Sequence, residues 1–493
     1  MFGREITAGL AFGYFHCACW VQSTLHFVLD RFKKHLDSSG LLRDSNLGIA
    51  SSNGPRVLVA YSGGADSTCL LHLLCQLGID VVAAHLHHGM RASADKELGL
   101  CQAFAQELNI PFIAGRADVP LMSRELKLSL EEAGRNARYA FFRNASMQSE
   151  CQLIATGHTQ SDLVETVIFN LARGTGMTGL SGIPESRENI IRPLLPFTRD
   201  ETRAYCEEHG LWFHDDPANV DVNNRRSRIR LNIAPELAQL NPDYSASIAR
   251  TASLIGEEDR FLNGMAAAAL EQAEMHPEHE LGFIGSPYEA TFDVLKLGHL
   301  PPVLLKRAIR LAVRAVGGEL DFDQTTVIAE QFAREPGSIT AEGGTATADW
   351  NDETFRVRDL TAVAPFRYPL TFPGETASDE LGWMLTAEPI EPTGEVAPRN
   401  ALVADFSADE IKGSLYFRNA QSGDQMQPSG FAGRRMLADL MSEAKLSSAI
   451  RQRLPIVCDL IGPLWAPGVC YDQRLRPSAA TKRAVRMAFG PVR

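Results

Sequence analysis

Apolar runs alternate with amphipathic stretches through the first half of the chain. Residues 57–61 are β-branched and apolar and lie between two glycine-containing segments, which predicts a buried strand. Residues 66–77 have the pattern of a following helix, which Gly78 ends. The alternation continues with strand-like runs at 79–89, 111–118 and 153–156 and helical tracts at 94–109 and 123–147. Strands that alternate with helices of this length predict an α/β fold with a doubly wound parallel sheet.

The pattern changes near residue 242, where we expect the parallel-sheet domain to end. The next hundred or so residues are mainly helical, and after them Pro, Gly, Thr and acidic residues indicate short strands and turns. The last part mixes strand-like runs with a helix. The predicted domains are 1–50 (leader and first helix), 51–242 (parallel sheet), 243–345 (mainly helical), 346–413 (acidic, strands and turns) and 414–493 (basic, small, mixed α+β).

Charge is distributed unevenly along the chain. The 493 residues carry a net charge of −12, which by itself argues against a nucleic-acid partner. Residues 341–413, however, hold 5 Lys and Arg against 14 Asp and Glu, whereas residues 416–493 hold 12 against 5. The basic C-terminal domain is therefore predicted to bind a polyanion locally.

Cysteine spacing and hydropathy indicate the cellular compartment in which the protein is expected. The nine cysteines form no even framework, and the sequence contains one CxC but no CxxC, so the usual zinc and iron–sulfur spacings are absent. No apolar run approaches the roughly 20 residues needed to cross a bilayer, and the N-terminal stretch lacks the basic start of a secretory signal. We expect a cytoplasmic protein with reduced thiols and no membrane partner. The sequence indicates no oligomeric state.

The stretch SGGADS, residues 62–67, lies where the first strand becomes a helix. Backbone N–H groups of such a turn and the helix N-terminus hold anions, and glycines let a phosphate approach the backbone. A Walker A loop would need a Lys after its last glycine, and a dinucleotide fingerprint would need a glycine where Ser67 stands. The stretch resembles the loop of the N-type ATP pyrophosphatases. This resemblance implies that ATP is split between its α- and β-phosphates while AMP passes to a substrate oxygen.

A second group of polar residues follows the fourth strand, at the edge where open α/β sheets bind their ligands. His158, Asp162 and Glu165 are spaced i, i+4 and i+7, which predicts one face of a helix. Two carboxylates and an imidazole in that place hold an amine, coordinate Mg²⁺ or move protons, and the spacing leaves these options open.

Together with other segments, the two motifs resemble the tRNA(Ile)-lysidine synthetase family. The other matching segments are HLHHGMRASAD (85–95), EEAGRNARY (131–139), RGTGMTGL (173–180), RPLL (192–195) with Arg199 after it, RSRIR (226–230) and SGDQMQPSGFAGRRMLADLM (422–441). The resemblance implies an adenine nucleotide alpha hydrolase-like catalytic fold. It also implies an ATP- and Mg²⁺-dependent ligase that joins L-lysine to C2 of the wobble cytidine of tRNA(Ile) with a CAU anticodon. The expected intermediate is an adenylated cytidine, with release of AMP and pyrophosphate.

The resemblance further implies roles for single residues. The residues expected to bind ATP are Ser62, Gly63, Gly64, Ala65, Asp66 and Ser67, and Asp66 is also expected near Mg²⁺ or the lysine. The expected catalytic residues are Asp66, Arg135, His158, Asp162 and Glu165. The residues expected to bind tRNA are Arg138, Arg226, Arg228, Arg230, Arg434, Arg435, Lys445 and Arg451, with Arg453 beside them. Thr159, Ser161 and Ser227 differ from the residues that the family usually shows at these positions.

Three other functions fit parts of the sequence. A tRNA thiolase of the same superfamily would use cysteines in catalytic or cluster-binding arrangements, and the missing CxxC counts against it. A ligase that amidates a small nucleotide would leave the basic tail and the RSRIR segment unexplained. A non-catalytic RNA-binding protein with a decayed loop would have no need of Asp66, Asp162 and Glu165. Cleavage of ATP to AMP and pyrophosphate separates the enzymes from this last alternative.

Overall fold

The computed structural model describes residues 27–43, 54–87, 89, 94–215, 225–275, 280–332 and 334–492. The chain forms two compact units, Met1–Asp259 and Arg260–Arg493, whose border falls inside the long helix α11 (Tyr244–Ala273). Of the predicted leader and first helix, a helix over 27–39 is present, while residues 1–26 and 44–50 lie outside the described ranges. Within those ranges, no helix combines the length and the apolarity needed to cross a membrane.

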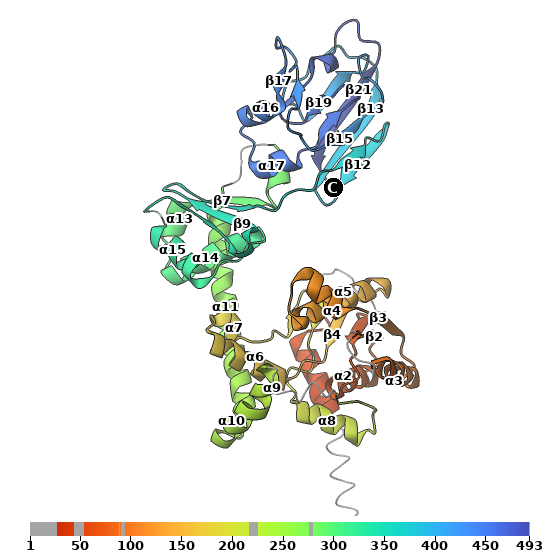
Figure 1. Ribbon diagram of the computed structural model, residues 1–493, viewed down its shortest axis with the longest axis vertical. Helices are drawn as coiled ribbons and strands as arrows, with labels where there is room; N and C mark the ends of the chain where they lie inside the picture. Colours follow the sequence, from red (N-terminus) through yellow and green to blue (C-terminus); the bar gives the residue numbers. More distant parts are fainter. Residues whose placement is uncertain are drawn as a thin grey trace, which may run out of the picture. The chain divides into compact units, whose positions relative to one another are not determined.

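The first unit contains a six-stranded sheet with the order β3-β2-β1-β4-β6-β5. Its strands are β1 (Val57–Ala60), β2 (Val81–His87), β3 (Phe112–Arg116), β4 (Leu153–Thr156), β5 (Ser186–Arg187) and β6 (Ile190–Ile191). Figure 1 labels its strands β2, β3 and β4. All neighbouring strands pair in parallel except β5, which runs antiparallel to β6. The parallel sheet predicted from the alternating pattern is confirmed.

Helices cover both faces of this sheet. Those packed on its strands include α2 (Ala65–Gln76), α3 (Ala94–Glu107), α5 (Leu130–Gln148) and α8 (Arg199–Glu208). Further helical elements of the unit are α4 (Val119–Leu126), α6 (Gln160–Arg173), α7 (Met177–Leu180), α9 (Arg225–Arg228), the π-helical turn η2 (Ile229–Ile233) and α10 (Ala234–Leu240). Val57 and Val59 of β1 share a core with α2, α3, α8 and the helix over 27–39, whereas Leu58 shares the opposite core with α5. Successive strand residues point to opposite faces, so the sheet is doubly wound as predicted.

The helical tract predicted over 123–147 is divided into α4 and α5. Helix α4 ends because Lys127 adopts the left-handed conformation, with φ of +54°. Ser129 then caps α5 by accepting a hydrogen bond from the N–H of Glu132. Neither Gly nor Pro marks the break, so the apolar periodicity did not reveal it.

The second unit begins with helices packed on an antiparallel sheet of order β7-β10-β9-β8. Trp350 and Phe355 of this sheet are buried in one core with α14 and α15. The elements are α12 (Gly282–Gly285), β7 (Glu289–Asp293), α13 (Val294–Gly298), α14 (Pro302–Ala315), α15 (Phe322–Gln331), β8 (Gly337–Thr340), β9 (Ala346–Trp350) and β10 (Thr354–Asp359). The region predicted as mainly helical therefore also contains strands.

Two larger sheets, with the orders β11-β15-β18-β19-β20 and β12-β13-β21-β14, form the C-terminal part together with the two-stranded sheet β16-β17. A shared core contains Trp383 and Trp465. The main elements are β11 (Arg367–Pro369), β12 (Gly374–Ser378), β13 (Trp383–Ile390), β14 (Val403–Ser407), β15 (Tyr416–Arg418), β16 (Gln425–Met426), β17 (Arg435–Met436), α16 (Leu437–Glu443), α17 (Ser448–Arg453), β18 (Ile456–Cys458), β19 (Pro463–Ala466), β20 (Cys470–Tyr471) and β21 (Ala484–Pro491).

The acidic segment predicted at 346–413 is not a region of its own. Strands β9 and β10 complete the sheet of the preceding helical part, whereas β11 to β14 belong to the two C-terminal sheets. The pairing of β13 with β21 joins Trp383 to Pro491 and Ile390 to Ala484. Because these partners lie about a hundred positions apart, composition along the chain did not indicate that they form one sheet.

Candidate active site

The loop between β1 and α2 has the backbone of an anion-binding turn. Gly63 has a φ of +82°, and a Cβ built on it would lie 2.8 Å from Cys101 Sγ and 3.0 Å from His214 Nδ1. A larger residue would therefore be strained and would collide with these neighbours. The hydroxyls of Ser62 and Ser67 lie 3.0 Å apart, and Ser67 Oγ accepts from the Ser62 N–H at 3.2 Å. These bonds hold the two ends of the loop together.

The first turn of α2 directs its amides toward a ligand. Gly64 is the N-cap residue, and no side chain caps the helix there, so backbone N–H groups are available to an anion. Gly157, which follows β4, approaches this turn so closely that a Cβ on it would lie 3.1 Å from the Ser67 nitrogen. The turn fits the phosphate groups of ATP. It contains all the residues predicted to bind ATP, Ser62, Gly63, Gly64, Ala65, Asp66 and Ser67.

Asp66 lies in this first turn and faces α8. Thr202 Oγ1 donates a hydrogen bond to Asp66 Oδ1, and Arg199 Nε lies 3.6 Å from Asp66 Oδ2. Burial nevertheless raises the pKa of Asp66 to about 6, because desolvation of the carboxylate outweighs these contacts and the charge of Asp162 adds to it. Asp66 therefore titrates closer to neutral pH than an ordinary aspartate does.

The second predicted group is divided between a loop and α6. Asp162 Oδ2 accepts from the backbone nitrogen of Thr159 at 2.8 Å and from its Oγ1 at 2.9 Å, which closes a capping box. The helix therefore begins at Gln160, and His158 precedes it. The prediction that His158 shares one helix face with Asp162 and Glu165 is wrong, because the Thr159 cap stands between them.

His158 still lies beside the carboxylates. Its Nδ1 is 2.8 Å from Thr156 Oγ1. Burial lowers the pKa of His158 to about 4, although the charge of Asp162 opposes the shift. The imidazole is therefore neutral near pH 7 and contributes hydrogen bonds rather than charge.

Arg199, for which no role was predicted from the sequence, joins the carboxylates. It is the first residue of α8, and its Nη2 lies 2.7 Å from Asp162 Oδ1 and its Nη1 3.0 Å from Glu165 Oε1. Burial by itself would raise the pKa of Asp162, but Arg199 and the capping bonds outweigh it and hold that pKa below its ordinary value. With its contact to Asp66, one guanidinium thus faces three carboxylates on two other helices.

Glu165 lies beneath the other two carboxylates. Its side chain is 6% exposed, compared with 23% for Asp66 and 22% for Asp162. Arg230, predicted to bind tRNA, contacts Glu165 through Nε at 2.8 Å and Nη2 at 3.2 Å. Two guanidinium groups therefore hold Glu165, whereas Asp66 and Asp162 are partly open to solvent.

Arginines of α5 and of the segment after β6 gather beside His158. The guanidinium of Arg135 lies 5.1 Å from the centre of the Tyr139 ring, and Arg192 is 5% exposed. Burial lowers the pKa of Arg138 and of Arg192, and the charge of Arg135 lowers both further. Cations that are desolvated and repel one another provide a favourable place for an anion.

The RSRIR segment is positioned by α9 and η2. Arg226 and Arg228 are exposed, whereas Ser227 between them is 3% exposed. The departure from the family pattern at Ser227 therefore falls on a buried position and leaves the two exposed arginines unchanged.

The C-terminal cations differ in exposure. Arg434 and Lys445 are exposed, whereas Arg435 pairs with Glu443 and Arg451 donates to the Leu446 carbonyl at 2.7 Å. The expectation that Arg453 contacts tRNA is contradicted. It is 4% exposed, its guanidinium lies 3.4 Å from the centre of the Tyr288 ring, and it pairs with Asp359 at 3.4 Å. Sequence alone did not distinguish this buried arginine from the exposed ones.

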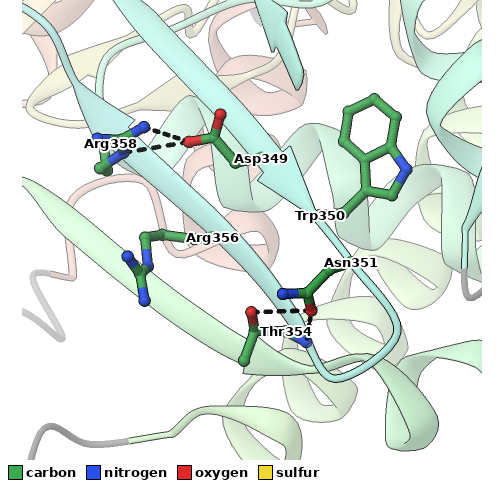
Figure 2. A pocket seen from close by; sticks show the side chains of 6 residues that line it. All are labelled: Asp349, Trp350, Asn351, Thr354, Arg356 and Arg358. Atoms are coloured by element: carbon green, nitrogen blue, oxygen red, sulfur yellow. Dashed lines mark hydrogen bonds and ion pairs between the residues drawn. The ribbon is translucent and has the colours of Figure 1, made fainter. Parts of the chain in front are cut away.

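A hollow of about 280 Å³ lies on the β7-β10-β9-β8 sheet (Figure 2). It differs from the active site because its polar side chains bond one another. Arg358 Nη2 pairs with Asp349, and Asn351 Oδ1 accepts from the N–H of Thr354 at 2.6 Å within the hairpin. These polar groups satisfy one another across the strands. The hollow therefore offers no arrangement comparable to the loop and carboxylates of the first unit.

Comparisons with known proteins identify the family. The profile of the PP-loop domain matches residues 39–237, and that of the TilS substrate C-terminal domain matches residues 415–487. A tRNA(Ile)-lysidine synthase of Symbiobacterium thermophilum is 32% identical over 93% of this chain and 97% of that protein. The chain belongs to the tRNA(Ile)-lysidine synthase family. Another member, from Dehalococcoides mccartyi, is 28% identical over 94% of this chain and 99% of that protein.

Membership of the tRNA(Ile)-lysidine synthase family confirms the resemblance found in the sequence, and it does not favour the thiolase or amidating alternatives. The PP-loop domain implies that the enzyme uses ATP. Among solved structures, a U34-tRNA thiolase from Methanococcus maripaludis aligns with 48% of this chain and 80% of its own, at 20% identity and a TM-score of 0.39.

Proposed function

We propose that this enzyme joins L-lysine to C2 of the wobble cytidine of tRNA(Ile) with a CAU anticodon, at the expense of ATP. The observation that carries the proposal is that the loop after β1 and the carboxylates of α6 lie next to each other in one unit. The amides and hydroxyls of the loop after β1 form a phosphate cradle, and Asp66, which closes that cradle, shares Arg199 with Asp162. A nucleotide on the loop and an amine on the carboxylates would therefore lie next to each other.

The first step activates the base. The cytosine O2 attacks the α-phosphorus of ATP, the bond to the β-phosphate oxygen breaks, and pyrophosphate leaves with its electron pair. The amides at the start of α2 and the hydroxyls of Ser62 and Ser67 hold the departing phosphates and stabilise their charge. The product of this step is a cytidine with AMP on O2.

Magnesium fits this cradle only together with phosphate oxygens. Within the described residues, no three His, Cys, Asp or Glu side chains are grouped so as to hold a metal ion. Mg²⁺ commonly uses one or two carboxylates, water and substrate phosphates, and Asp66 is the carboxylate in the first turn of α2. When bound, the ion would neutralise phosphate charge.

The second step transfers the amine. The lysine Nε attacks C2, the bond from C2 to oxygen breaks, and AMP leaves with that oxygen. The attacking amine, with an ordinary pKa near 10.4, must first lose a proton. Asp162 suits the binding and orientation of the ammonium, because Arg199 and the capping bonds lower the pKa of its carboxyl and keep it ionised.

The arginines would hold the RNA. Arg135 and Arg138 lie beside the neutral His158, and Arg226 and Arg228 are exposed, so these cations would receive the anticodon loop and its phosphates. In the C-terminal domain, Arg434 and Lys445 are exposed cations suited to the tRNA backbone, with Arg435 and Arg451 beside them.

Transfer of labelled lysine tests this proposal. Purified enzyme, ATP, Mg²⁺ and labelled lysine would be mixed with a tRNA(Ile) transcript that has a CAU anticodon and, as a control, with a transcript whose wobble base is replaced. We expect ATP-dependent incorporation into the first transcript alone. Equal labelling of both transcripts would contradict the assigned base. ATP cleavage to AMP and pyrophosphate without incorporation would contradict the assigned nucleophile.

A further inference from the structure

Arg199 is anchored to α6 by its backbone as well as by its side chain. Its N–H donates to Ser161 Oγ at 3.1 Å, while Thr198 and Glu201 form a capping box at the start of α8. Both ends of Arg199 are therefore fixed against the helix that carries Asp162 and Glu165. The guanidinium is held at a set place among the carboxylates and does not reach them as a long, free side chain would.

The ion pairs around Arg199 form a row of alternating charge. Arg230 contacts the buried Glu165, Glu165 contacts Arg199, and Arg199 contacts Asp162 and Asp66 at the solvent side. Glu165 is thus held by two guanidinium groups, is 6% exposed, and supports Arg199 from beneath. The open end of the row consists of Asp66, Asp162 and the 27% exposed Arg199.

The charge of this pocket is nearly balanced. Its ion-paired side chains are Asp66, Asp162, Glu165, Arg199 and Arg230, from α2, α6, α8 and η2. His158 lies beside them, with the cations Arg135, Arg138 and Arg192 around it. Burial and the charges of Asp200 and Glu165 raise the pKa of Tyr244 of α11, so it is neutral. Within the row of ion pairs itself, three carboxylates face two guanidinium groups, so the carboxylates exceed them by one charge. One ammonium group would balance it.

We propose that Arg199 is a positioning residue that keeps the amine pocket at a single excess negative charge, so that the pocket binds the lysine ammonium and still releases its proton. This inference rests on the proposed function. A pocket of uncompensated carboxylates would bind an ammonium tightly but would raise the pKa of its amine, and each unit of that rise lowers the fraction of free amine about tenfold. The guanidinium limits this effect without removing the carboxylates that orient the substrate.

The neutral variant Arg199→Met separates this role from a merely structural one. With tRNA and ATP saturating, we expect kcat to fall at least about 10-fold, while the KM for lysine stays the same or falls, because the more negative pocket retains the ammonium. Distortion of the pocket would instead raise that KM, and a smaller folded fraction would lower the apparent kcat equally for every amine substrate. We expect Arg199→Lys, which keeps the charge, to recover most of the lost kcat.

A less basic amine gives a second, independent measurement. In aminoethylcysteine, sulfur replaces the γ-methylene of lysine and lowers the basicity of the amine. The loss of kcat in Arg199→Met should be clearly smaller with this analogue than with lysine, because its amine is deprotonated more easily. An equal loss with both amines, or a rise in the KM for lysine, would overturn the proposal.

Arg203→Met is the matched control. Arg203 lies one turn later on α8 and also contacts two carboxylates, Glu207 and Asp215, but its side chain is 43% exposed and makes no ion pair with the carboxylates of the pocket. We expect Arg203→Met to have the kcat of the wild type. The ratio of its kcat with lysine to its kcat with aminoethylcysteine should also equal that of the wild type. If Arg199→Met is recovered unfolded, Arg199→Gln, which is also neutral but can donate hydrogen bonds, provides the same comparison.

The wild-type enzyme distinguishes this inference from the proposed function. If the wild type does not incorporate lysine, the proposed function fails whatever the variants do. If it does, and Arg199→Met still transfers AMP to tRNA in the absence of lysine, the variant is folded and its defect lies in the amine step. Loss of AMP transfer in a folded Arg199→Met would overturn the proposal, since the guanidinium would then serve the first step.

Discussion

Ion pairs of the active site and of the C-terminal domain differ in their access to water. In the pocket, the side chains of Asp66 and Asp162 are 23% and 22% exposed although both face Arg199. In the C-terminal domain, Arg474 pairs with Asp459 at 2.9 Å and with Asp472 at 3.1 Å, and these carboxylates are 0% and 5% exposed. The first arrangement leaves room for a ligand, whereas the second is closed.

The closed and the partly open carboxylate–guanidinium pairs serve different purposes. Asp459 also accepts bonds from the backbone N–H groups of Lys412, Ile461 and Gly462, so all its capacity is used within the protein. A closed, fully bonded pair holds loops in place, and removal of one partner leaves a buried charge without compensation. A partly open pair retains capacity to exchange a contact for a substrate. Substitutions in the two regions should therefore affect different properties.

The largest effect is expected for Asp162→Asn. Loss of the carboxylate removes a contact proposed for the amine, and we expect lysidine formation to fall at least about 10³-fold. Because the amide can still accept from the Thr159 N–H, the thermal midpoint should change little. Glu207→Gln, an exposed carboxylate paired with Arg203 on α8, is the control. Activity of Asp162→Asn near that of the control would show that the pocket does not bind the reacting amine.

Asp459→Asn should lower stability and leave activity unchanged, which is the opposite of Asp162→Asn. The substitution leaves Arg474 buried beside one carboxylate fewer, and we expect the free energy of unfolding of the second unit to fall by about 3 kcal/mol. Turnover per folded molecule at low temperature should equal that of the wild type. Denaturant unfolding and activity, measured on the same sample, check this. A stable but inactive variant would contradict the division between the two regions.

The two regions should also respond to pH with opposite sign. Bonds from the backbone and from Arg474 outweigh burial and hold the pKa of Asp459 below its ordinary value, so its contribution to stability is present above about pH 4 and is lost as the pH falls further. The pKa of Asp66 is raised to about 6. Its contribution is therefore complete below about pH 4 and is lost as the pH rises through 6.

Calorimetry of the wild type, Asp459→Asn and Asp66→Asn over this range measures both contributions. The stability lost in Asp459→Asn should shrink on acidification, whereas Asp66→Asn should become more stable than the wild type as the pH rises above 6. Destabilisation of Asp66→Asn at neutral pH would contradict the raised pKa.

The smallest effect is expected at the C-terminal cations proposed to bind tRNA. Arg434→Glu should weaken tRNA binding several-fold and reduce the dependence of affinity on salt by about one unit of slope, without a change in ATP binding. Arg435→Glu should weaken it less, because Arg435 already pairs with Glu443. Titrations of labelled tRNA at several salt concentrations measure both variants. Unchanged tRNA affinity in Arg434→Glu would remove this residue from the interface.

The sequence predicted the phosphate loop more completely than the carboxylate pocket. Residues 62–67 are contiguous and lie at one strand end, so local pattern and composition were sufficient. The pocket instead joins α2, α6, α8 and η2, and Arg199 lies 34 and 37 positions from Glu165 and Asp162. The TRDE sequence at 198–201 is a capping-box signal that would have placed a helix start at Arg199. It would not have shown which carboxylates the side chain meets.

The remaining differences follow from burial and from long-range pairing. Arg453 lies near exposed cations in the sequence but packs on Tyr288, which no local pattern indicates. His158 was placed on the helix because its spacing to Asp162 is helical, although the Thr159 capping box starts the helix after it. The spacing correctly indicated that His158 and Asp162 lie close together. The position of the helix cap determined that only Asp162 lies on the helix.

Transfer of AMP to tRNA(Ile) without lysine tests most directly the claim that loop and pocket serve successive steps. ATP labelled at the α-phosphate would be mixed with the transcript and either the wild type or Asp162→Asn, and labelled RNA would be measured before and after addition of lysine. We expect both enzymes to label the RNA to a similar extent, and we expect lysine to remove the label only with the wild type. Failure of Asp162→Asn to label the RNA would contradict this claim, since the pocket would then be needed for the first step.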